Sequence, residues 1–484
     1  MKTSLRNLNT FGDVAAEEDS VLEYFLTTDA VRRIEANEGF LVLGRKGAGK
    51  TALVRHFGEG KSGALSKALN LRRYPWALHA SRVDRGASEI ETYVSSWRFL
   101  IAVELASLVL TRTERPQFDQ VIALRRFMDD NYGGVSPDLA NILRPRRLQL
   151  TGTSIRPQVL GTSLGGVDLE RKSDDMQLGV ELNAVSDAIL SSTVKIAENE
   201  KLGPLILHFD ELDQGLSEID NNRSRMLIGL VLAAREVRRE LKSTSVTANP
   251  VVYLRTDLWD DLEFSDKNKI SQGQALPVEW TTESLLRLVN LRLEARLGKG
   301  ISWNDVADDA LMRGSQQKWD HILSRTFLRP RDVIRFLNAA LSQAKARSAE
   351  PCIFLNEDIV AARDEYSTYL KKELDDEILP HWPQWEEALQ ALSDVGTITF
   401  ERGEFEENYK KRSSSKNLID ADHALELLYR FSVVGYERRS GYGGSSWTFQ
   451  YTDPGAGYDR NASRFKIHPG LKEYAKLREA RQGL

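Results

Sequence analysis

The sequence predicts an α/β fold with a parallel sheet, and three short apolar runs are the basis of that prediction. Residues 40–43, 205–209 and 251–254 spell Phe-Leu-Val-Leu, Leu-Ile-Leu-His-Phe and Val-Val-Tyr-Leu. Such runs are typical of strands that are buried on both faces of a parallel sheet. Each is followed by glycine or polar residues. Because ligands bind beyond the carboxyl ends of parallel strands, these residues are candidates for a binding site.

The first run leads into a glycine-rich loop. Residues 44–51 spell Gly-Arg-Lys-Gly-Ala-Gly-Lys-Thr, the G-x-x-x-x-G-K-T spacing of a phosphate-binding P-loop. The glycines let backbone N–H groups turn around phosphates, and the helix predicted to open at Ala52 adds partial positive charge there. Lys50 is expected to reach the β- and γ-phosphates, and the Thr51 hydroxyl to ligate Mg²⁺.

The second run ends in an acidic cluster, Asp210-Glu211-Leu212-Asp213. After a buried strand downstream of a P-loop, this pattern predicts a Walker B strand: Asp210 holds Mg²⁺ and Glu211 polarises the attacking water. A solvated acidic turn is the alternative. His208 is expected to be a packed histidine. The predicted nucleotide-binding residues are Gly44, Arg45, Lys46, Gly47, Ala48, Gly49, Lys50, Thr51, Ala52 and Asp210, with Thr51 and Asp210 as metal ligands. ATP and Mg²⁺ are therefore expected, and Lys50 and Glu211 are candidate catalytic residues of an ATPase.

The third run ends in Arg255-Thr256-Asp257. In P-loop ATPases with an additional strand, the next core strand ends in a polar residue that senses the γ-phosphate. Arg255 is the first candidate for this role and Thr256 the second. The alternative is that Arg255 forms a surface ion pair with Asp257 or Asp260, and the sequence leaves the two interpretations open.

A fourth segment, residues 327–338, predicts a helix whose first turn contains Pro330 and Asp332. Apolar residues follow at three-to-four spacing, so one face is expected to pack inward. Arg329 and Arg331 then lie at the helix start. From there Arg331, and with it Arg329, can contact the γ-phosphate. The alternative for both is a solvated or ion-paired arginine.

Together, residues 44–51, 205–213, 254–257 and 329–338 resemble the STAND and KAP-like branch of bacterial AAA-related ATPases. More narrowly, the chain looks like a bacterial P-loop ATPase family that opens with a Phe-Gly…Ala-Glu segment, here residues 11–17. That family continues with a Gly-Arg-Lys-Gly-x-Gly-Lys loop and a Leu-Arg-x-Asp strand end. The resemblance implies ATP hydrolysis, self-association and a place in bacterial stress or antiphage modules. No arginine finger acting in trans is identified.

Bulk properties limit the class of protein. The 484 residues carry a formal net charge of −4, which gives no overall nucleic-acid-binding signature. The single cysteine, Cys352, excludes an intrachain disulfide and fits a reducing compartment. No apolar segment follows the first residues, and the apolar helix expected at 97–110 is too short to span a bilayer. A cytoplasmic protein without a membrane partner is expected.

The motifs and composition predict five parts. Residues 1–81 hold N-terminal helices and the P-loop half of the core, with a strand at 75–79. Residues 82–185 form a helical insertion, with helices at 90–113 and 118–131 and a hairpin-like stretch at 150–166. Residues 186–280 complete the core, and residues 281–380 form a helical lid and a linker helix at 356–374.

The fifth part, residues 381–484, is predicted to be a winged-helix domain. Helices at 385–392 and 421–431 precede strands at 433–436 and 447–451 around a glycine-rich turn, and a last strand covers 464–467. The second helix carries Asp422 and Glu426, which disfavours base reading in DNA. A protein-docking role is therefore preferred over DNA contact.

Two function hypotheses follow. The first is an ATP-hydrolysing molecular switch that forms homo-oligomers and works in bacterial signalling or antiphage defence, with an effector protein as partner. The second is a DNA-associated ATPase similar to origin-recognition or transposition helper proteins. Salt-dependent binding to duplex DNA separates the two hypotheses.

Overall fold

The computed structural model describes residues 4–59, 63–72, 74–80, 89–144, 175–213, 221–413, 419–439 and 444–479. The chain divides into two compact units. The sheet unit comprises Thr27–Arg45 and Lys50–Val278, and the C-terminal unit comprises Met1–Leu26, Lys46–Gly49 and Glu279–Leu484. Each unit has its own hydrophobic core.

The sheet unit is built on a five-stranded parallel sheet with the order β2-β3-β4-β1-β5. The strands are β1 (Leu41–Leu43), β2 (Leu65–Asn70), β3 (Leu205–Asp210), β4 (Ala248–Leu254) and β5 (Ala275–Pro277). Every residue of β3 and β4 is buried, as the three apolar runs predict. The predicted α/β fold with a parallel sheet is therefore confirmed. β4 lies between the strand that leads into the P-loop and the strand that ends in Asp210.

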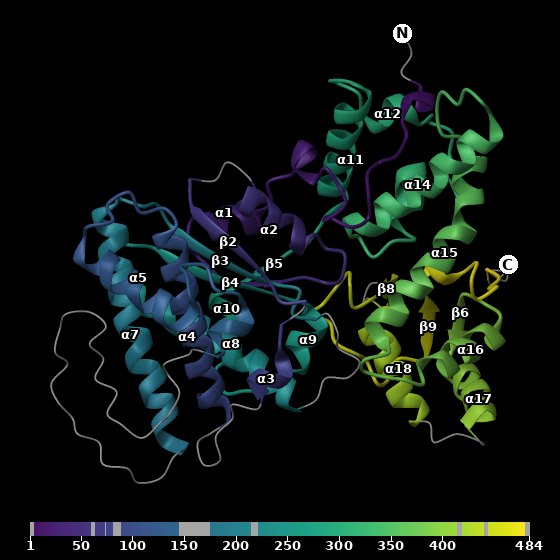
Figure 1. Ribbon diagram of the computed structural model, residues 1–484. Coiled ribbons are helices and arrows are strands. Elements are labelled where there is room, and N and C mark those ends of the chain that lie inside the picture. Colours follow the sequence, from purple (N-terminus) through teal and green to yellow (C-terminus); the bar gives the residue numbers. More distant parts are fainter. Residues whose placement is uncertain are drawn as a thin grey trace. The chain divides into compact units, whose positions relative to one another are not determined.

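Helices cover both faces of this sheet (Figure 1). On β3, the neighbouring residues His208 and Phe209 point to opposite faces. His208 stacks on Phe57 of α2 (Lys50–Glu59), and Phe209 meets Trp97 of α4 (Glu89–Leu110) edge to face. The other helices of the unit are α1 (Asp29–Glu35), α3 (Trp76–Ala80), α5 (Asp119–Tyr132), α6 (Leu139–Ile142), α7 (Asp175–Asn199), α8 (Asn221–Leu241), α9 (Thr256–Asp261) and α10 (Lys267–Gly273).

One helix among the described residues, at Ile90–Leu110, is long and apolar enough to cross a membrane. In the structure, 94% of its most apolar window is buried inside the protein. It packs along α7 and α8, and its side chains belong to the core of the sheet unit. Its apolar composition is therefore explained by its place at the centre of this core.

Two segments of the sheet unit, residues 75–79 and 150–166, do not confirm their predictions. The strand expected at 75–79 is wrong, because Trp76–Ala80 form helix α3. One helical turn brings Trp76 and His79 onto the same side, where both rings contact Tyr74. The strand of this region is β2, which has a polar sequence because it lies at the sheet edge. The predicted hairpin-like stretch at 150–166 lies outside the described residues.

The C-terminal unit is mainly helical. Its helices are α11 (Thr282–Leu297), α12 (Trp303–Val306), α13 (Lys318–Leu323), α14 (Pro330–Arg347), α15 (Asn356–Ile378), α16 (Trp385–Val395), α17 (Arg402–Ser413) and α18 (Ala421–Arg430). Short 3-10 helices at Leu5–Asn7, Val21–Tyr24 and Pro469–Leu471 complete it. As predicted, Pro330 opens α14 and Asp332 lies in its first turn.

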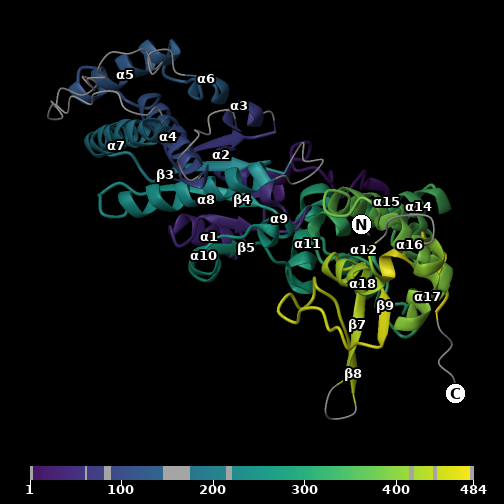
Figure 2. The ribbon, with the colours of Figure 1, turned by 90° about the horizontal axis from the view of Figure 1, so that it is seen from below.

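The last part of this unit adds an antiparallel sheet to α16, α17 and α18. Its strands are β6 (Thr399–Glu401), β7 (Val434–Arg439), β8 (Ser445–Thr448) and β9 (Arg464–Ile467), in the order β6-β9-β7-β8. Figure 2 shows β7 and β8 as a pair of neighbouring strands next to β9. The sequence predicted β7, β8 and β9 but missed β6 and α17. The glycine-rich turn predicted between β7 and β8 falls largely on residues 440–443, outside the described part.

Candidate nucleotide site

The P-loop follows β1 as predicted, and its glycines have the backbone geometry that a phosphate loop needs. Gly47 has φ +78° and Gly49 has φ +101°, both in the left-handed region that disfavours other residues. A Cβ atom on Gly47 would lie 2.9 Å from the Cβ of Arg331, whereas a Cβ on Gly49 would meet no atom within 4 Å. Gly47 is therefore needed for close packing as well as conformation, and space remains beside Gly49. The loop tip Lys46–Gly49 groups with the C-terminal unit, and the rest of the loop with the sheet unit.

Lys50, the first residue of α2, turns its side chain back over its own loop. Nζ donates to the carbonyl oxygens of Gly44, at 2.9 Å, and Arg45, at 3.3 Å. Burial lowers the pKa of Lys50, and the carboxylates of Asp213 and Asp210 partly oppose this. The ammonium group of Lys50 thus donates to neutral carbonyl oxygens, and phosphate oxygens can replace these as acceptors. The lysine therefore fits the nucleotide role predicted for it.

Thr51 and Asp210, the two predicted metal ligands, are brought together. Thr51, in the first turn of α2, lies close enough to Asp210, at the carboxyl end of β3, for its hydroxyl to lower the pKa of that carboxyl. Burial raises the pKa of Asp210, while the N–H of Glu211, the charge of Lys50 and the Thr51 hydroxyl oppose that rise. A hydroxyl and a carboxylate side by side are hard oxygen ligands, and Mg²⁺ is typically bound by one or two such groups together with substrate phosphates. The residues present therefore fit the ion.

Glu211 has an unusual backbone. Its φ is +59°, a left-handed conformation that costs a non-glycine residue about 1–3 kcal/mol. The side chain is buried, and the backbone N–H of Glu211 lies close enough to Asp210 to lower the pKa of its carboxyl. Residues kept in such conformations cluster at functional sites. This backbone supports the role predicted for Glu211.

Arg255 combines features of both interpretations left open by the sequence. Its guanidinium is buried and makes two hydrogen bonds to Asp257, at 3.0 and 2.6 Å, and a longer ion pair to Asp213 at 3.6 Å. The ion pair with Asp257 is thus present. The charges of Arg255, Asp213 and Asp257 also act on the pKa of Lys50, so the pair lies close to the site. Thr256 begins α9 beside it.

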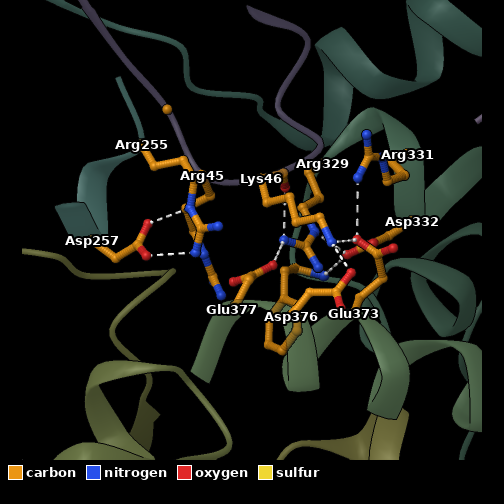
Figure 3. A network of polar contacts seen from close by, with 12 residues as sticks. Arg45, Lys46, Arg255, Asp257, Arg329, Arg331, Asp332, Glu373, Asp376 and Glu377 are labelled. Carbon is orange, nitrogen blue, oxygen red and sulfur yellow. Dashed lines mark hydrogen bonds and ion pairs between the residues drawn. The ribbon is translucent and has the colours of Figure 1, made fainter. Parts of the chain in front are cut away.

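Within the C-terminal unit, Arg329 holds the P-loop tip (Figure 3). It is among the largest fully buried side chains, and its Nη1 donates to the backbone oxygen of Lys46 at 2.7 Å. Nε bonds Asp332 of α14 at 2.7 Å, and Nη1 also pairs with Glu377 of α15. These two carboxylates hold the pKa of Arg329 well above its usual range, against the effect of burial.

Arg331 and Trp280 add two contacts to the same tip. The backbone N–H of Arg331 lies 3.5 Å from the oxygen of Gly47, and the indole N–H of Trp280 donates to the oxygen of Ala48 at 2.9 Å. Three successive carbonyl oxygens, those of Lys46, Gly47 and Ala48, therefore face donors of the C-terminal unit. Because the C=O and N–H of a peptide point in opposite directions, this leaves the N–H groups of the tip for the phosphate side.

The side chains of Lys46 and Arg331 are paired with acidic residues of α15 (Figure 3). Lys46 Nζ lies 2.6 Å from Asp376 and 3.4 Å from Glu373, and Arg331 Nη1 lies 3.2 Å from Glu373. Arg331 thus lies at the loop tip, and its guanidinium has the carboxylate partner that the alternative interpretation gives it. The sequence analysis missed Glu373, Asp376 and Glu377. The only signal was the acidic run at the end of the predicted linker helix.

Comparisons with known proteins give partial matches. A model of the FunZ-associated C-terminal helical domain matches residues 283–375. The transposon gamma-delta 80.3 kDa protein of Escherichia coli K12 is 23% identical over 496 residues, which cover 95% of this chain and 66% of that protein. The chain thus spans just under two thirds of the length of this relative.

The comparison with solved structures gives matches that cover most of the chain at low TM-scores. The Aeropyrum pernix ORC1 protein in complex with DNA is 16% identical with a TM-score of 0.34, covering 92% of this chain and 91% of that one. The Aeropyrum pernix ORC2 protein is 13% identical with a TM-score of 0.39, covering 92% and 89%. A Walker-type ATPase of Pyrococcus abyssi is 13% identical with a TM-score of 0.41, covering 98% and 99%. These scores are too low to relate the function of those proteins to this chain.

Proposed function

We propose that this chain is a Mg²⁺-dependent ATPase that works in association with DNA. The ATPase part is supported chiefly by the closeness of Thr51 and Lys50 to Asp210, because these residues belong to the two halves of a Mg²⁺–triphosphate site, and Thr51 and Asp210 lie 159 residues apart in the sequence. The DNA part is supported by the transposon relative, whose similarity extends over nearly the whole chain.

In this proposal each residue has one task. The N–H groups of the loop and Lys50 bind the phosphates, and Thr51 and Asp210 hold Mg²⁺. When bound, Mg²⁺ neutralises the negative charge that develops on the transferred phosphoryl group. Glu211 orients the attacking water and accepts its proton. Arg329, the Arg331 N–H and Trp280 keep the loop tip in the conformation that presents its N–H groups.

The relative from a transposon favours the second function hypothesis over the first. A role in signalling or antiphage defence has no comparable support. The winged-helix assignment remains a prediction, which is supported by three helices and an antiparallel sheet at residues 385–467. The STAND and KAP-like affiliation, self-association and a cytoplasmic location also remain hypotheses.

The test is phosphate release from ATP by the purified chain, measured with Mg²⁺ and with or without a duplex DNA of mixed sequence. We expect Mg²⁺-dependent turnover, and retention of the labelled duplex by the protein at low salt. Absence of turnover in the presence of Mg²⁺ would contradict the ATPase assignment, and turnover that survives removal of Mg²⁺ would contradict its dependence on the metal. If the wild-type protein hydrolyses ATP but does not bind the duplex at low salt, the ATPase part of the proposal stands and the DNA part is contradicted.

A further inference from the structure

A cluster of positive charges surrounds His321 in the C-terminal unit. His321, on α13, is 4% exposed, and its Nδ1 lies 3.1 Å from the Gln316 side-chain oxygen. Because that oxygen only accepts, Nδ1 carries the hydrogen and Nε2 presents a lone pair. Nε2 accepts from two nitrogens of Arg363 of α15, at 3.1 and 2.6 Å. Burial and the nearby cations Arg325, Arg363 and Lys472 lower the pKa of His321 to about 3, so the ring is neutral.

Arg325 is the most deeply buried cation of this cluster. Only 7% of it is exposed, and its Nη1 donates to the backbone oxygen of His321 at 3.1 Å and to Ser324 Oγ at 3.4 Å. Its Nε has no hydrogen-bond partner among the described residues. Burial and then the charge of Arg363 lower the pKa of Arg325 to about 10. The described contacts of this guanidinium are therefore neutral oxygens.

The carboxylates nearby compensate these charges only in part. Glu473 and Glu479 act electrostatically on both Arg325 and Arg363, but within the described part of the chain neither lies at ion-pair distance from either arginine. Glu479 pairs instead with Lys472, at 2.6 Å. Lys466 of β9 adds a further cation, whose pKa is lowered by burial and by Arg325.

Other buried arginines of the same unit are paired. Arg292 forms an ion pair with Asp19 at 2.8 Å, and Arg329 is bonded to Asp332 and Glu377. Buried charges in proteins are normally paired, because an uncompensated one loses its hydration without gaining an opposite charge. Arg325 and Arg363 depart from that rule together. An anion from outside the described chain would satisfy both.

We propose that Arg325, Arg363 and Lys466 form a binding site for a phosphate group. Guanidinium groups match phosphate oxygens with paired hydrogen bonds, and two arginines with a lysine supply donors from the α13–α14 connection, α15 and β9. Arg363 and Lys466 are half-buried, so both are accessible to solvent. The source that we favour, a phosphate of a DNA backbone, rests on the proposed function; inorganic phosphate is the other source.

The first arm of the test uses a fluorescein-labelled duplex DNA and fluorescence anisotropy over a salt series. One phosphate contact contributes a slope of about −0.9 to log K, the logarithm of the association constant, against log salt concentration. Such a contact therefore raises the affinity by a factor of about eight at 0.1 M salt relative to 1 M. We expect Arg363→Gln and Arg325→Gln each to lose about eightfold in affinity at 0.1 M salt and to make the slope shallower by about 1. The matched control is Arg335→Gln, because Arg335 has a carboxylate partner, Glu365, at 2.6 Å. It should bind like wild type.

The second arm measures the unfolding temperature in inorganic phosphate and in chloride at equal ionic strength. Phosphate should stabilise wild type and Arg335→Gln but not Arg363→Gln or Arg325→Gln. If the variants lose both DNA affinity and stabilisation by phosphate, the site binds a DNA phosphate. If they lose only the stabilisation by phosphate, the site binds free phosphate. Variants that match wild type in both arms overturn the site. Wild type that binds no duplex contradicts the DNA part of the proposed function, while the second arm still decides on this site.

Discussion

Two clusters of cations in the C-terminal unit differ in one respect. At the P-loop tip, Lys46, Arg329 and Arg331 each have carboxylate partners on α14 or α15. Around His321, neither Arg325 nor Arg363 forms an ion pair within the described part of the chain. Both clusters contain a deeply buried arginine, so burial alone does not distinguish them.

The difference indicates what each cluster does. A paired cation is already neutralised, and its remaining donors hold the backbone, as Arg329 holds the Lys46 oxygen. A cation that contacts only neutral atoms has no opposite charge beside it, so its charge remains available to bind an anionic ligand. Lys50 belongs to this second class, because its Nζ bonds two loop carbonyls. A γ-phosphate contact by Arg331 remains a prediction, and it requires the guanidinium to leave Glu373.

The largest effect on ATP turnover is expected at Lys50, whose Nζ donates to backbone carbonyl oxygens. Lys50→Ala removes the charge nearest the β- and γ-phosphates and should reduce ATP turnover at least about a hundredfold. The control is Arg55→Ala on the same helix, because Arg55 is paired with Glu59 at 2.9 Å. Steady-state phosphate release measures both variants. If Lys50→Ala and Arg55→Ala lose the same fraction of ATP turnover, a carboxylate partner does not distinguish structural cations from those that bind a ligand.

The next effect concerns Glu211. Glu211→Gln keeps the size of the side chain and leaves the backbone N–H beside Asp210, but loses the group that accepts the proton of water. Turnover should drop by about a hundredfold or more, while ATP binding is retained. Binding of a fluorescent ATP analogue and single-turnover hydrolysis separate the two quantities. Wild-type hydrolysis by this variant would place the catalytic acid elsewhere.

Removing a partner from the paired cluster should cost stability. Glu377→Ala leaves the buried Arg329 with Asp332 as its only carboxylate partner among the described residues, which should lower the free energy of unfolding by about 3 kcal/mol. Glu365→Ala removes the partner of the more exposed Arg335 and should cost less than about 1 kcal/mol. Urea denaturation measures both. If Glu377→Ala unfolds at the wild-type urea concentration, the carboxylates are not what keeps Arg329 in place.

The sequence predicted the parts of the site that are local in the chain. The spacing of Gly44, Lys50 and Thr51 encodes one turn, and Asp210 follows directly on its strand, so neighbouring residues suffice for both. The contacts of the loop tip were not predictable, because Lys46 and Asp376 are 330 positions apart and no motif links them. The pairing of His321 with Arg363, on different helices, was missed for the same reason. Strand β2 was missed because its polar sequence reflects an edge position.

The smallest effect is expected where the loop tip meets solvent. The Lys46–Asp376 pair is 2.6 Å long, but the Asp376 side chain is 66% exposed, and such pairs contribute less than about 1 kcal/mol. In Asp376→Asn, Lys46 keeps Glu373, and the tip keeps its carbonyl bonds to Arg329 and Trp280. The KM for ATP should therefore change by less than about twofold. A tenfold change in KM would mean that this exposed pair, and not the buried Arg329, sets the conformation of the loop.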